Sequence, residues 1–367
     1  MIPNQWYAIL ESNEIKKGHP IGVTRMAEKL VAWRDSAGKL TVMADKCPHR
    51  GVALSIGKIK TDCIQCPFHG FEYATSGECT LIPANGKDAR PPKAMQVKTY
   101  PTREAHGFVY IWWGEPLESY PPLPYFEALD ERFVYATLRD HWNTHYSRAI
   151  ENQLDVVHLP FVHRTTIGAG NKTLVNGPLT HIKSLYPGDN LLELWVYNEV
   201  DTGQKPLKPS QITEPQRRPF LQFRFPNVWH NWIANDVRVF VAFAPIDHEN
   251  TMMYLRYYYT NKTPILRQII GFFGSIANLV IERQDKWVVV TQQPKRADLD
   301  IGETLIQGDG PIIAYRKIRR ELMENTHKFG MENTHKFGME NTHKFGMENT
   351  HKFGMENTHI GMENTQP

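Results

Sequence analysis

The sequence predicts an α+β protein in which a small all-β domain precedes an antiparallel sheet covered by helices. Short apolar runs divided by Gly and Pro turn signals fill residues 1–116, which we assign to the first domain. Longer runs that alternate apolar with polar residues, together with helical segments, fill residues 117–322, the second domain. At 367 residues the chain is long enough for two domains with sizeable cores.

The first domain is predicted from short strands and turns. The segment Asp35–Gly38 is a turn signal, and the Gly and Pro residues of 114–124 indicate a linker to the second domain. The predicted strands cover residues 6–10, 29–34, 40–42, 71–73, 80–82 and 107–113.

The second domain is predicted to start with a helix over residues 146–158 and to end with a helix of roughly 25 residues that begins near Thr263. An apolar run lies within the second helix, from Ile269 to Ile281, and is shorter than the roughly 20 residues that a membrane-spanning helix needs. We therefore expect a buried core helix or a subunit-interface helix rather than membrane association. The strands predicted between the two helices cover residues 191–197, 221–225, 237–243 and 252–259.

Composition excludes several classes of protein. The formal net charge of +3 is too small to indicate nucleic-acid binding, and no basic run is interleaved with aromatic residues. Four cysteines do not make a disulfide framework, and the first residues lack the apolar region of a signal peptide. We expect a reducing, cytoplasmic setting.

Residues 323–367 repeat the octapeptide Met-Glu-Asn-Thr-His-Lys-Phe-Gly, with degenerate copies at the end. The histidine in each copy could suggest metal binding. A period of eight does not keep one face of a helix, however, and too few apolar residues recur to build a core. We expect a disordered tail without a catalytic role.

Two short loops each offer one cysteine and one histidine, and each ends in glycine: Cys47–Gly51 and Cys66–Gly70. A Rieske [2Fe-2S] cluster needs this set, with two thiolates on one iron and two imidazoles on the other. A zinc site is the alternative, because Cys47, His49, Cys66 and His69 could form a tetrahedral set and Cys63-Ile64-Gln65-Cys66 is a Cys-x-x-Cys pair. Common zinc sites pair like residues, whereas each loop here mixes the two. Cys63 and Cys79 are left as buried or spare thiols.

A second constellation lies in residues 151–163. On a helix Asn152, Asp155 and His158 share one face, and Pro160 disfavours the α conformation at the preceding residue, so the chain can bend and return His163 to the same place. Two imidazoles and one carboxylate on one side of Fe(II) leave positions open for O₂ and substrate. We expect the third ligand to be a distant carboxylate: Asp285 on the late helix, or Glu282 one turn earlier.

The two loops, followed by Asn152-x2-Asp155-x2-His158-x4-His163, resemble the α subunits of Rieske non-haem iron oxygenases, also called aromatic ring-hydroxylating oxygenases. The spacing between Asn152 and Asp155 is similar to the short monooxygenase and demethylase branch. The resemblance covers residues 1 to about 320. It implies a Rieske β domain joined to a helix-grip catalytic domain, assembled as a homotrimeric ring.

The resemblance also assigns the ligands. Cys47, His49, Cys66 and His69 hold the cluster, with the histidines on the outer iron, and His158, His163 and Asp285 hold the mononuclear Fe(II). Asp155 then bridges a cluster histidine of one subunit to His158 of its neighbour. The segment Arg283-Gln284-Asp285 departs from the Glu-Glu-Asp pattern common in relatives, so Asp285 follows less directly than the two histidines.

Insertion of one oxygen atom of O₂ into a C–H bond, with reduction of the other to water, consumes a pair of electrons. No Gly-x-Gly-x-x-Gly follows a strand, so a separate reductase or ferredoxin is expected to bring electrons from NAD(P)H. Arg50, Lys58 and Lys60 near the loops either attract an acidic partner or form a solvated surface.

The substrate is expected to be a small aromatic or cyclic molecule, and hydroxylation, demethylation and cis-dihydroxylation all remain open. Arg217 and Arg218 either meet an anionic substrate group or belong to a surface loop. Two other classes are a simple electron carrier, which leaves the second domain unexplained, and a zinc-stabilised binding protein, which would be colourless. Aromatic residues that could line a pocket, or simply fill the core, are Phe161, Phe220, Phe223, Phe225, Trp229 and Trp232.

Overall fold

The computed structural model describes residues 1–168, 172–173, 175–184, 189–196, 199–200, 202–208, 211–212, 218–260 and 263–324. The chain divides into two compact units, Met1–Arg320 and Glu321–Pro367. The predictions made for Tyr197, Arg217 and the repeat beyond residue 324 lie outside the described residues.

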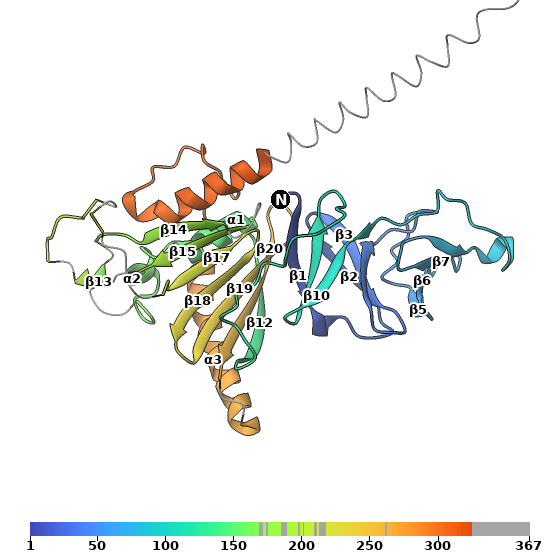
Figure 1. The fold of residues 1–367 in the computed structure, drawn as a ribbon, viewed down its shortest axis with the longest axis horizontal. Coiled ribbons are helices and arrows are strands. Elements are labelled where there is room, and N and C mark those ends of the chain that lie inside the picture. The colour runs from blue at the N-terminus through green and yellow to red at the C-terminus, as the bar shows by residue number, and fades with distance from the viewer. Residues whose placement is uncertain are drawn as a thin grey trace, which may run out of the picture. The chain divides into compact units, whose positions relative to one another are not determined.

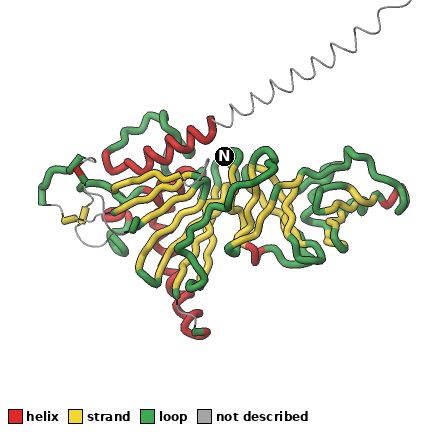
Figure 2. Tube along the Cα trace, in the orientation of Figure 1, coloured by secondary structure: helices red, strands yellow, loops and turns green. Residues whose placement is uncertain are grey.

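The N-terminal part of the first unit is built from short antiparallel strands, as predicted (Figures 1 and 2). The strands form three sheets, of which the four-stranded sheet with the order β5-β6-β7-β8 presents the two Cys-His loops. The strands are β1 (Gln5–Glu11), β2 (Ile21–Arg25), β3 (Glu28–Arg34), β4 (Leu40–Ala44), β5 (Lys58–Lys60), β6 (Cys63–Gln65), β7 (Glu72–Ala74), β8 (Cys79–Leu81), β9 (Thr99–Tyr100), β10 (Thr102–Ala105) and β11 (Phe108–Trp113). Two 3-10 turns, Ser12–Glu14 and Pro83–Asn85, complete this part.

A separate apolar cluster supports the loops. Trp33, Ile64 and Tyr73 are fully buried and pack together with the two loop cysteines, Cys47 and Cys66. Because close packing fixes side-chain positions, the thiols are held in place before any metal binds.

The second part is a seven-stranded antiparallel sheet with the order β12-β20-β19-β18-β17-β15-β14. A small two-stranded sheet (β13, Lys172–Thr173, with β16, Glu199–Val200) lies apart from it. The strands of the large sheet are β12 (Val134–Trp142), β14 (Leu179–Ser184), β15 (Asn190–Trp195), β17 (Leu221–Arg224), β18 (Val228–Ala234), β19 (Val237–Pro245) and β20 (Thr251–Tyr259). The helices are α1 (Tyr146–Leu154), α2 (Leu159–Val162), α3 (Pro264–Val289), a 3-10 turn at Gln307–Asp309 and a helix over residues 310–324.

One face of the large sheet packs against the first domain. Phe240 and Tyr258 of this face share a core with Trp6 and Phe108 of β1 and β11. Buried polar contacts reinforce the packing: Asn227 Nδ2 donates to the Ala8 carbonyl (2.8 Å), and Arg256 Nε lies 3.0 Å from Glu11 Oε1. Removing one partner of such a buried pair leaves an unpaired charge, which costs about 3–5 kcal/mol, so the two domains are expected to unfold together.

The other face carries α1, α2 and α3. Two glycines let α3 approach the sheet closely, because a Cβ at Gly274 would collide with the Tyr257 ring and one at Gly271 would lie 2.7 Å from Tyr259 Oη. This close approach places residues 274–285 of α3 beside the sheet, where the candidate site lies. The predicted late helix is thus confirmed in position and length.

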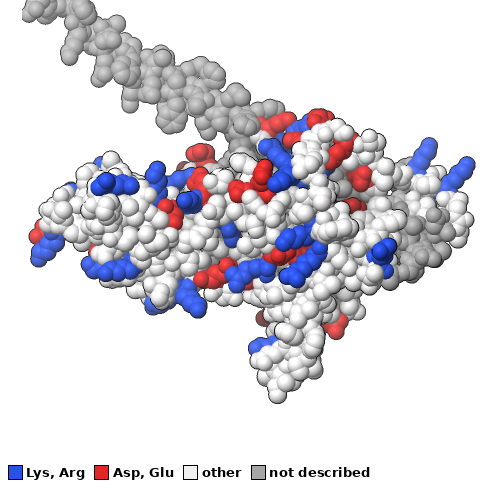
Figure 3. Space-filling view, turned by 180° about the vertical axis from the view of Figure 1, so that it is seen from behind, with Lys and Arg blue, Asp and Glu red and all other residues white. Residues whose placement is uncertain are grey.

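Two alternatives were predicted for the apolar run of α3, a buried core helix or a subunit-interface helix. The first does not hold for the outer face, where Phe272 and Phe273 are 61% and 65% exposed in the single chain, and the second stays a prediction. Figure 3 shows the end of α3 that projects below the sheet as a mostly uncharged surface. Among the described helices, α3 alone is long and apolar enough to cross a membrane. This is weak evidence, because core helices of soluble proteins pass the same test.

Candidate functional site

The two Cys-His loops have the same backbone hydrogen-bond pattern. In each loop the cysteine N–H donates to a carbonyl beyond the glycine, and the glycine N–H donates back to the cysteine carbonyl. Gly51 and Gly70 have φ values of +75° and +73°, which glycine adopts without strain. The four bonds are Cys47 N to Val52 O (2.8 Å), Gly51 N to Cys47 O (2.9 Å), Cys66 N to Phe71 O (2.8 Å) and Gly70 N to Cys66 O (3.0 Å).

The ligand side chains of the loops are arranged with sulfur inside and imidazole outside. Cys47 and Cys66 are each 2% exposed, whereas His49 and His69 are exposed, with ring centroids 4.7 Å apart. Tyr73 Oη lies 3.1 Å from Cys47 Sγ, and burial keeps the pKa of this phenol above its usual value, so it remains a donor to sulfur. Hydrogen bonds to the sulfur atoms are one means of tuning a cluster potential.

The arrangement of these side chains fits a Rieske cluster. The two thiols are buried and the two imidazoles are exposed, with the ring centroids 4.7 Å apart. In a Rieske cluster two thiolates bind one iron and two imidazoles bind the other.

The two remaining cysteines do not join the loops. Cys63 Sγ lies 3.5 Å from Thr80 Oγ1, and Cys79 Sγ donates to the Leu81 carbonyl at 3.6 Å. Burial raises the pKa of the Cys79 thiol. Cys79 is buried and Cys63 is partly buried, and their assignment as spare thiols stays a prediction.

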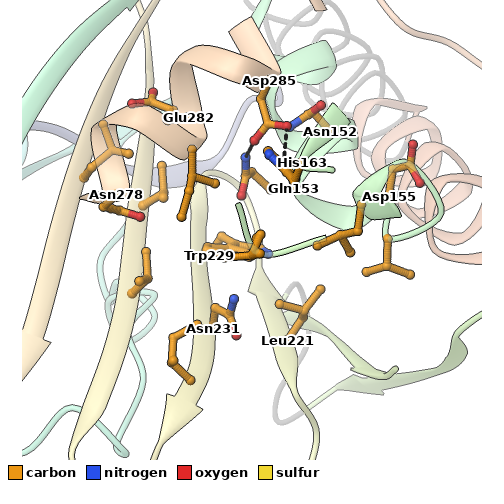
Figure 4. Close-up of a pocket in the computed structure, with 18 of the residues that line it drawn as sticks. Asn152, Gln153, Asp155, His163, Leu221, Trp229, Asn231, Asn278, Glu282 and Asp285 are labelled. Carbon is orange, nitrogen blue, oxygen red and sulfur yellow. Dashed lines mark hydrogen bonds and ion pairs between the residues drawn. The ribbon is translucent and has the colours of Figure 1, made fainter. Parts of the chain in front are cut away.

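His158, His163 and Asp285 converge at one end of a cavity, although they come from α2, its flanks and α3 (Figure 4, which labels His163 and Asp285). Asp285 Oδ1 lies 2.9 Å from His163 Nε2 and 3.2 Å from His158 Nε2, and the two Nε2 atoms are 3.3 Å apart. His163 and Asp285 are buried, and His158 is nearly so.

These distances fit three ligands of one octahedral ion. Ligand atoms that bind an ion at about 2.1 Å and at right angles lie about 3.0 Å apart, on one triangular face. Burial opposes the charged form of His158, yet Asp155 and Asp285 outweigh it and raise the pKa of His158 to about 9. The field at this point therefore favours a cation, and a metal ion competes with the proton for the same lone pairs.

The chain around His158 differs from the prediction. Helix α1 ends at Leu154, and Asp155 is its C-cap, so Asn152, Asp155 and His158 do not share one helix face. Asp155 Oδ1 accepts from the Val157 N–H at 2.8 Å, and this local bond competes with helix continuation. The turn brings His158 toward the metal position.

Pro160 does not prevent a helical conformation at the preceding residue, contrary to the prediction. It occupies the first turn of α2, where proline is tolerated, and the preceding residue, Leu159, is helical. His158 and His163 are the caps of this four-residue helix, and one helical turn between them brings their rings together. The bend predicted at Leu159 therefore lies earlier, at residues 155–157.

Two glutamines that the sequence reasoning missed orient the triad. Gln284 Oε1 lies 2.9 Å from His163 Nδ1, so the ring proton sits on Nδ1 and the Nε2 lone pair points at the metal position. Gln153 Nε2 donates to Asp285 Oδ2 at 3.4 Å. The only sequence signal was adjacency, since Gln284 precedes Asp285 and Gln153 follows Asn152. On the other ring, Asp155 Oδ2 lies 3.4 Å from His158 Nδ1.

The fallback ligand, Glu282, does not belong to the converging group. Burial, with the nearby charges of Asp140 and Asp285, raises the pKa of Glu282 well above its usual value. A raised pKa means that the carboxyl group holds its proton more firmly, and this opposes metal binding. Figure 4 shows Glu282 one turn from Asp285 on α3, with its carboxyl group turned away from the triad.

A buried ion network fixes α1 beneath the triad. Arg316 Nε lies 2.6 Å from Glu151 Oε1, and Arg316 and Arg148 both reach Glu303 at 2.6 and 2.7 Å. Glu151 precedes Asn152, so the network holds the backbone that carries the site. Such networks specify one arrangement more than they add stability.

The triad opens into a cavity of about 790 Å³ between α3 and the sheet. Most of its lining is aliphatic or aromatic. Of the aromatic residues predicted to line a pocket, Phe220 and Trp229 do so. Phe161 is instead 70% exposed, Phe223 and Phe225 pack on Tyr315, and Trp232 stacks under Arg218 and Arg238.

Comparisons with known proteins agree with this architecture. Residues 5–101 match the model of the Rieske [2Fe-2S] domain, and residues 142–325 match that of the vanillate O-demethylase oxygenase C-terminal domain. Aminopyrrolnitrin oxygenase PrnD of Pseudomonas fluorescens is 36% identical over 171 residues, 45% of this chain and 47% of that protein. The matches cover 47%, 37% and 56% of the length of the first three curated relatives, so the chain spans about half of their length.

Two further proteins match over most of their length. Methylxanthine N1-demethylase NdmA of Pseudomonas putida is 27% identical over 340 residues, 89% of this chain and 90% of that protein. Its solved structure has a TM-score of 0.67 and covers 89% of this chain and 92% of that one. Dicamba monooxygenase bound to dicamba has a TM-score of 0.67 at 19% identity, covering 90% and 99%. The chain belongs to the vanillate O-demethylase oxygenase C-terminal domain family and, with its Rieske domain, to the short monooxygenase and demethylase branch of the Rieske non-haem iron oxygenases.

Proposed function

We propose that this protein is the terminal oxygenase component of a Rieske system that hydroxylates or demethylates a small aromatic or cyclic substrate. The observation that supports this most is the convergence of His158, His163 and Asp285 at the end of a 790 Å³ cavity, in a chain that also holds two Cys-His loops. An electron carrier has no use for the second site, and a zinc-binding module does not account for the match of residues 5–101 to the Rieske [2Fe-2S] domain.

Each side chain has a role in this proposal. Cys47, Cys66, His49 and His69 hold the [2Fe-2S] cluster, and His158, His163 and Asp285 hold Fe(II). When bound, the cluster supplies single electrons and the mononuclear iron binds and reduces O₂.

The protein shapes the surroundings. Gln284 keeps the proton of His163 on Nδ1, and Gln153 fixes Asp285. Apolar residues of the sheet and α3 exclude water from the cavity and hold the substrate beside the triad. Asn152, whose buried Nδ2 has no hydrogen-bond partner among the described residues, lies beside the triad and is a candidate to orient O₂ or substrate.

We propose that electrons pass between subunits of a homotrimer. Within the unit Met1–Arg320, the strands β5–β7 that present the cluster loops and the helix α2 beside the triad lie at opposite ends (Figure 1). The cluster histidines are exposed, and Asp155, 28% exposed, lies 3.4 Å from His158 Nδ1. A histidine of a neighbouring subunit that meets Asp155 would complete a path from cluster to iron. The resemblance to the family and the exposure of the cluster histidines and of Asp155 support this assembly. The resemblance also supports a domain boundary near residue 116.

A separate ferredoxin or reductase is proposed as the electron donor, with NAD(P)H as the source. Among the matching structures is an oxygenase–ferredoxin complex of carbazole 1,9a-dioxygenase, with a TM-score of 0.69 and 21% identity. Lys58 and Arg50 are exposed near the loops, whereas Lys60 is paired with Glu72 at 2.7 Å. The first two are cations that could attract an acidic partner.

Demethylation and hydroxylation are favoured over the alternative, cis-dihydroxylation of a ring, because the second domain matches an O-demethylase family. The relatives named as a methylxanthine demethylase and as a toluene-4-sulfonate monooxygenase belong to the same group of activities. We propose a cytoplasmic location.

The test combines optical spectra with oxygen consumption. Purified protein is expected to be coloured, to give a rhombic EPR signal when reduced, and to consume O₂ with NADH and a surrogate reductase only when a substrate from a panel of neutral and acidic cyclic compounds is present. A colourless protein that binds zinc would contradict the proposal, as would a coloured protein that lacks mononuclear iron.

A further inference from the structure

The cavity wall contains polar atoms without partners among the described residues. Trp229 Nε1 and Asn231 Oδ1 are buried, and neither has a hydrogen-bond partner in the part of the chain that the structure describes. Both residues belong to β18 and line the cavity. Asn231 pairs in register with Leu221 on one side and Val239 on the other, so an amide stands where the sheet otherwise presents apolar side chains.

Figure 4 shows how these residues lie in the cavity. His163 and Asp285 are at one end, Trp229 is in the middle, and Asn231 lies on the far side of Trp229 from the triad. Asn278 of α3 also faces the cavity. A molecule that reaches the metal position and fills the cavity therefore passes Trp229 and ends near the Asn231 amide.

The lining of the cavity limits what fits there. It includes no lysine or arginine among the described residues. Arg218 and Arg238 are engaged on Trp232, which does not line the cavity. An anionic group at the Asn231 end would lose its hydration without a described cation to replace it.

We propose that Asn231 and Trp229 orient the substrate by hydrogen bonds to a carbonyl, hydroxyl or amide group at its end remote from the iron triad, and that the substrate is a neutral, largely apolar molecule. This inference rests on the proposed function and names the substrate class of the same site. The indole N–H requires an acceptor, and the asparagine amide can both donate and accept, so a single carbonyl or amide group satisfies both. The apolar remainder contacts the sheet and α3.

The test measures binding to iron-loaded protein without O₂ or reductase, so its result does not depend on turnover. Three probes share one skeleton: 2-naphthamide is neutral and polar, 2-naphthoate is anionic, and 2-methylnaphthalene has no polar group. Equilibrium dialysis is expected to show the amide bound at least about tenfold more tightly than the carboxylate, a ratio typical of one satisfied hydrogen bond.

Asn231→Leu is the matched variant. It is expected to weaken binding of 2-naphthamide about tenfold and to leave binding of 2-methylnaphthalene unchanged or tighter. Its thermal midpoint should not fall, because the buried Oδ1 that it removes has no hydrogen-bond partner among the described residues. Asn235→Leu, in the exposed turn after the same strand, is the control and should change none of these values.

The proposal is overturned if the carboxylate binds as tightly as the amide, or if the amide does not bind up to its solubility. It is also overturned if Asn231→Leu weakens the hydrocarbon as much as the amide or lowers the thermal midpoint, since the asparagine would then be structural. Failure of the proposed function would appear separately, as absent substrate-dependent O₂ consumption with these binding results intact.

Discussion

The cluster loops and the His-His-Asp site are built in different ways. The loops lie within residues 47–70, and each is closed by its own backbone hydrogen bonds. The triad joins residues 158, 163 and 285, and it exists only because α3 packs against the sheet beside α2. The first site is a property of a local segment, whereas the second is a property of the fold.

The two sites also differ in what they expose. The cluster loops bury their thiols and expose their imidazoles, as an electron-transfer group that must meet a partner requires. The triad is buried at the end of an apolar cavity, where water would compete with O₂ and substrate. Substitutions in each region can test the cluster loops and the triad independently.

The largest expected effect is the loss of one metal site without the other. His163→Ala removes a ligand of the triad and is expected to abolish mononuclear iron binding while the visible spectrum of the cluster survives. Cys66→Ser is expected to do the reverse, unless loss of the cluster unfolds its small core. Iron analysis and optical spectra measure both, and joint loss in His163→Ala would indicate a single shared site.

Asp155→Asn is expected to leave both metals bound and to reduce product formation at least about a hundredfold, a loss of roughly 2.7 kcal/mol in transition-state stabilisation. The amide oxygen can still accept from the Val157 N–H, so the turn persists, but the charge beside His158 is lost. Steady-state turnover with a surrogate reductase measures the effect. Asp300→Asn, at an exposed carboxylate, is the control, and turnover near wild type in Asp155→Asn would remove Asp155 from the electron path.

Gln284→Leu is expected to weaken mononuclear iron binding about 10- to 100-fold, because His163 loses the acceptor that fixes its ring. Gln284→Glu retains an acceptor and should stay within a few-fold of wild type. Retention of iron during dialysis against a chelator gives the ratio. Arg283→Gln, exposed on the same helix, controls for the helix itself. Equal retention in the leucine variant would show that Gln284 does not position His163.

The smallest effect concerns a buried histidine outside both sites. Burial, aided by Arg238, lowers the pKa of His230 to about 3. Between pH 6.5 and 3 the unfolded chain therefore binds more protons than the folded chain, and stability falls as pH falls. From pH 7 to pH 5 this histidine accounts for about 2 kcal/mol.

His230→Phe is expected to reduce the difference in thermal midpoint between pH 7 and pH 5, whatever it does to stability at pH 7. His19→Phe, at the surface, serves as the control. An unchanged difference in His230→Phe would mean that His230 is not buried in its neutral form. The pH dependence of stability could then not be assigned to a histidine that is buried away from both metal sites.

The Rieske domain could be predicted from the sequence because proline, glycine, cysteine and histidine lie close together in each of the two loops. The triad was predictable only in part. His158 and His163 followed from their spacing, but the helix expected through His158 ends at Leu154, because the Asp155 side chain satisfies the backbone of the turn. No local pattern could show that side chain competing with the helix.

The remaining features depend on tertiary contacts. Gln284 was noticed only as a departure from a pattern, and its contact with His163 requires α3 to cross α2. Asn231 follows the alternation of β18, but only the packing of α3 makes that face of the strand a cavity wall. The outer face of α3 is exposed in the single chain, and composition could not decide whether it belongs to the core or to a subunit interface.

The most direct measurement mixes two inactive chains. Cluster-deficient Cys66→Ser and triad-deficient His163→Ala chains, carrying different affinity tags, are co-expressed, and assemblies that contain both are purified. In a head-to-tail ring of three, each mixed ring contains one intact cluster facing one intact triad, so about one third of wild-type activity per ring is expected. Mixed assemblies that are no more active than either parent would contradict electron transfer between subunits.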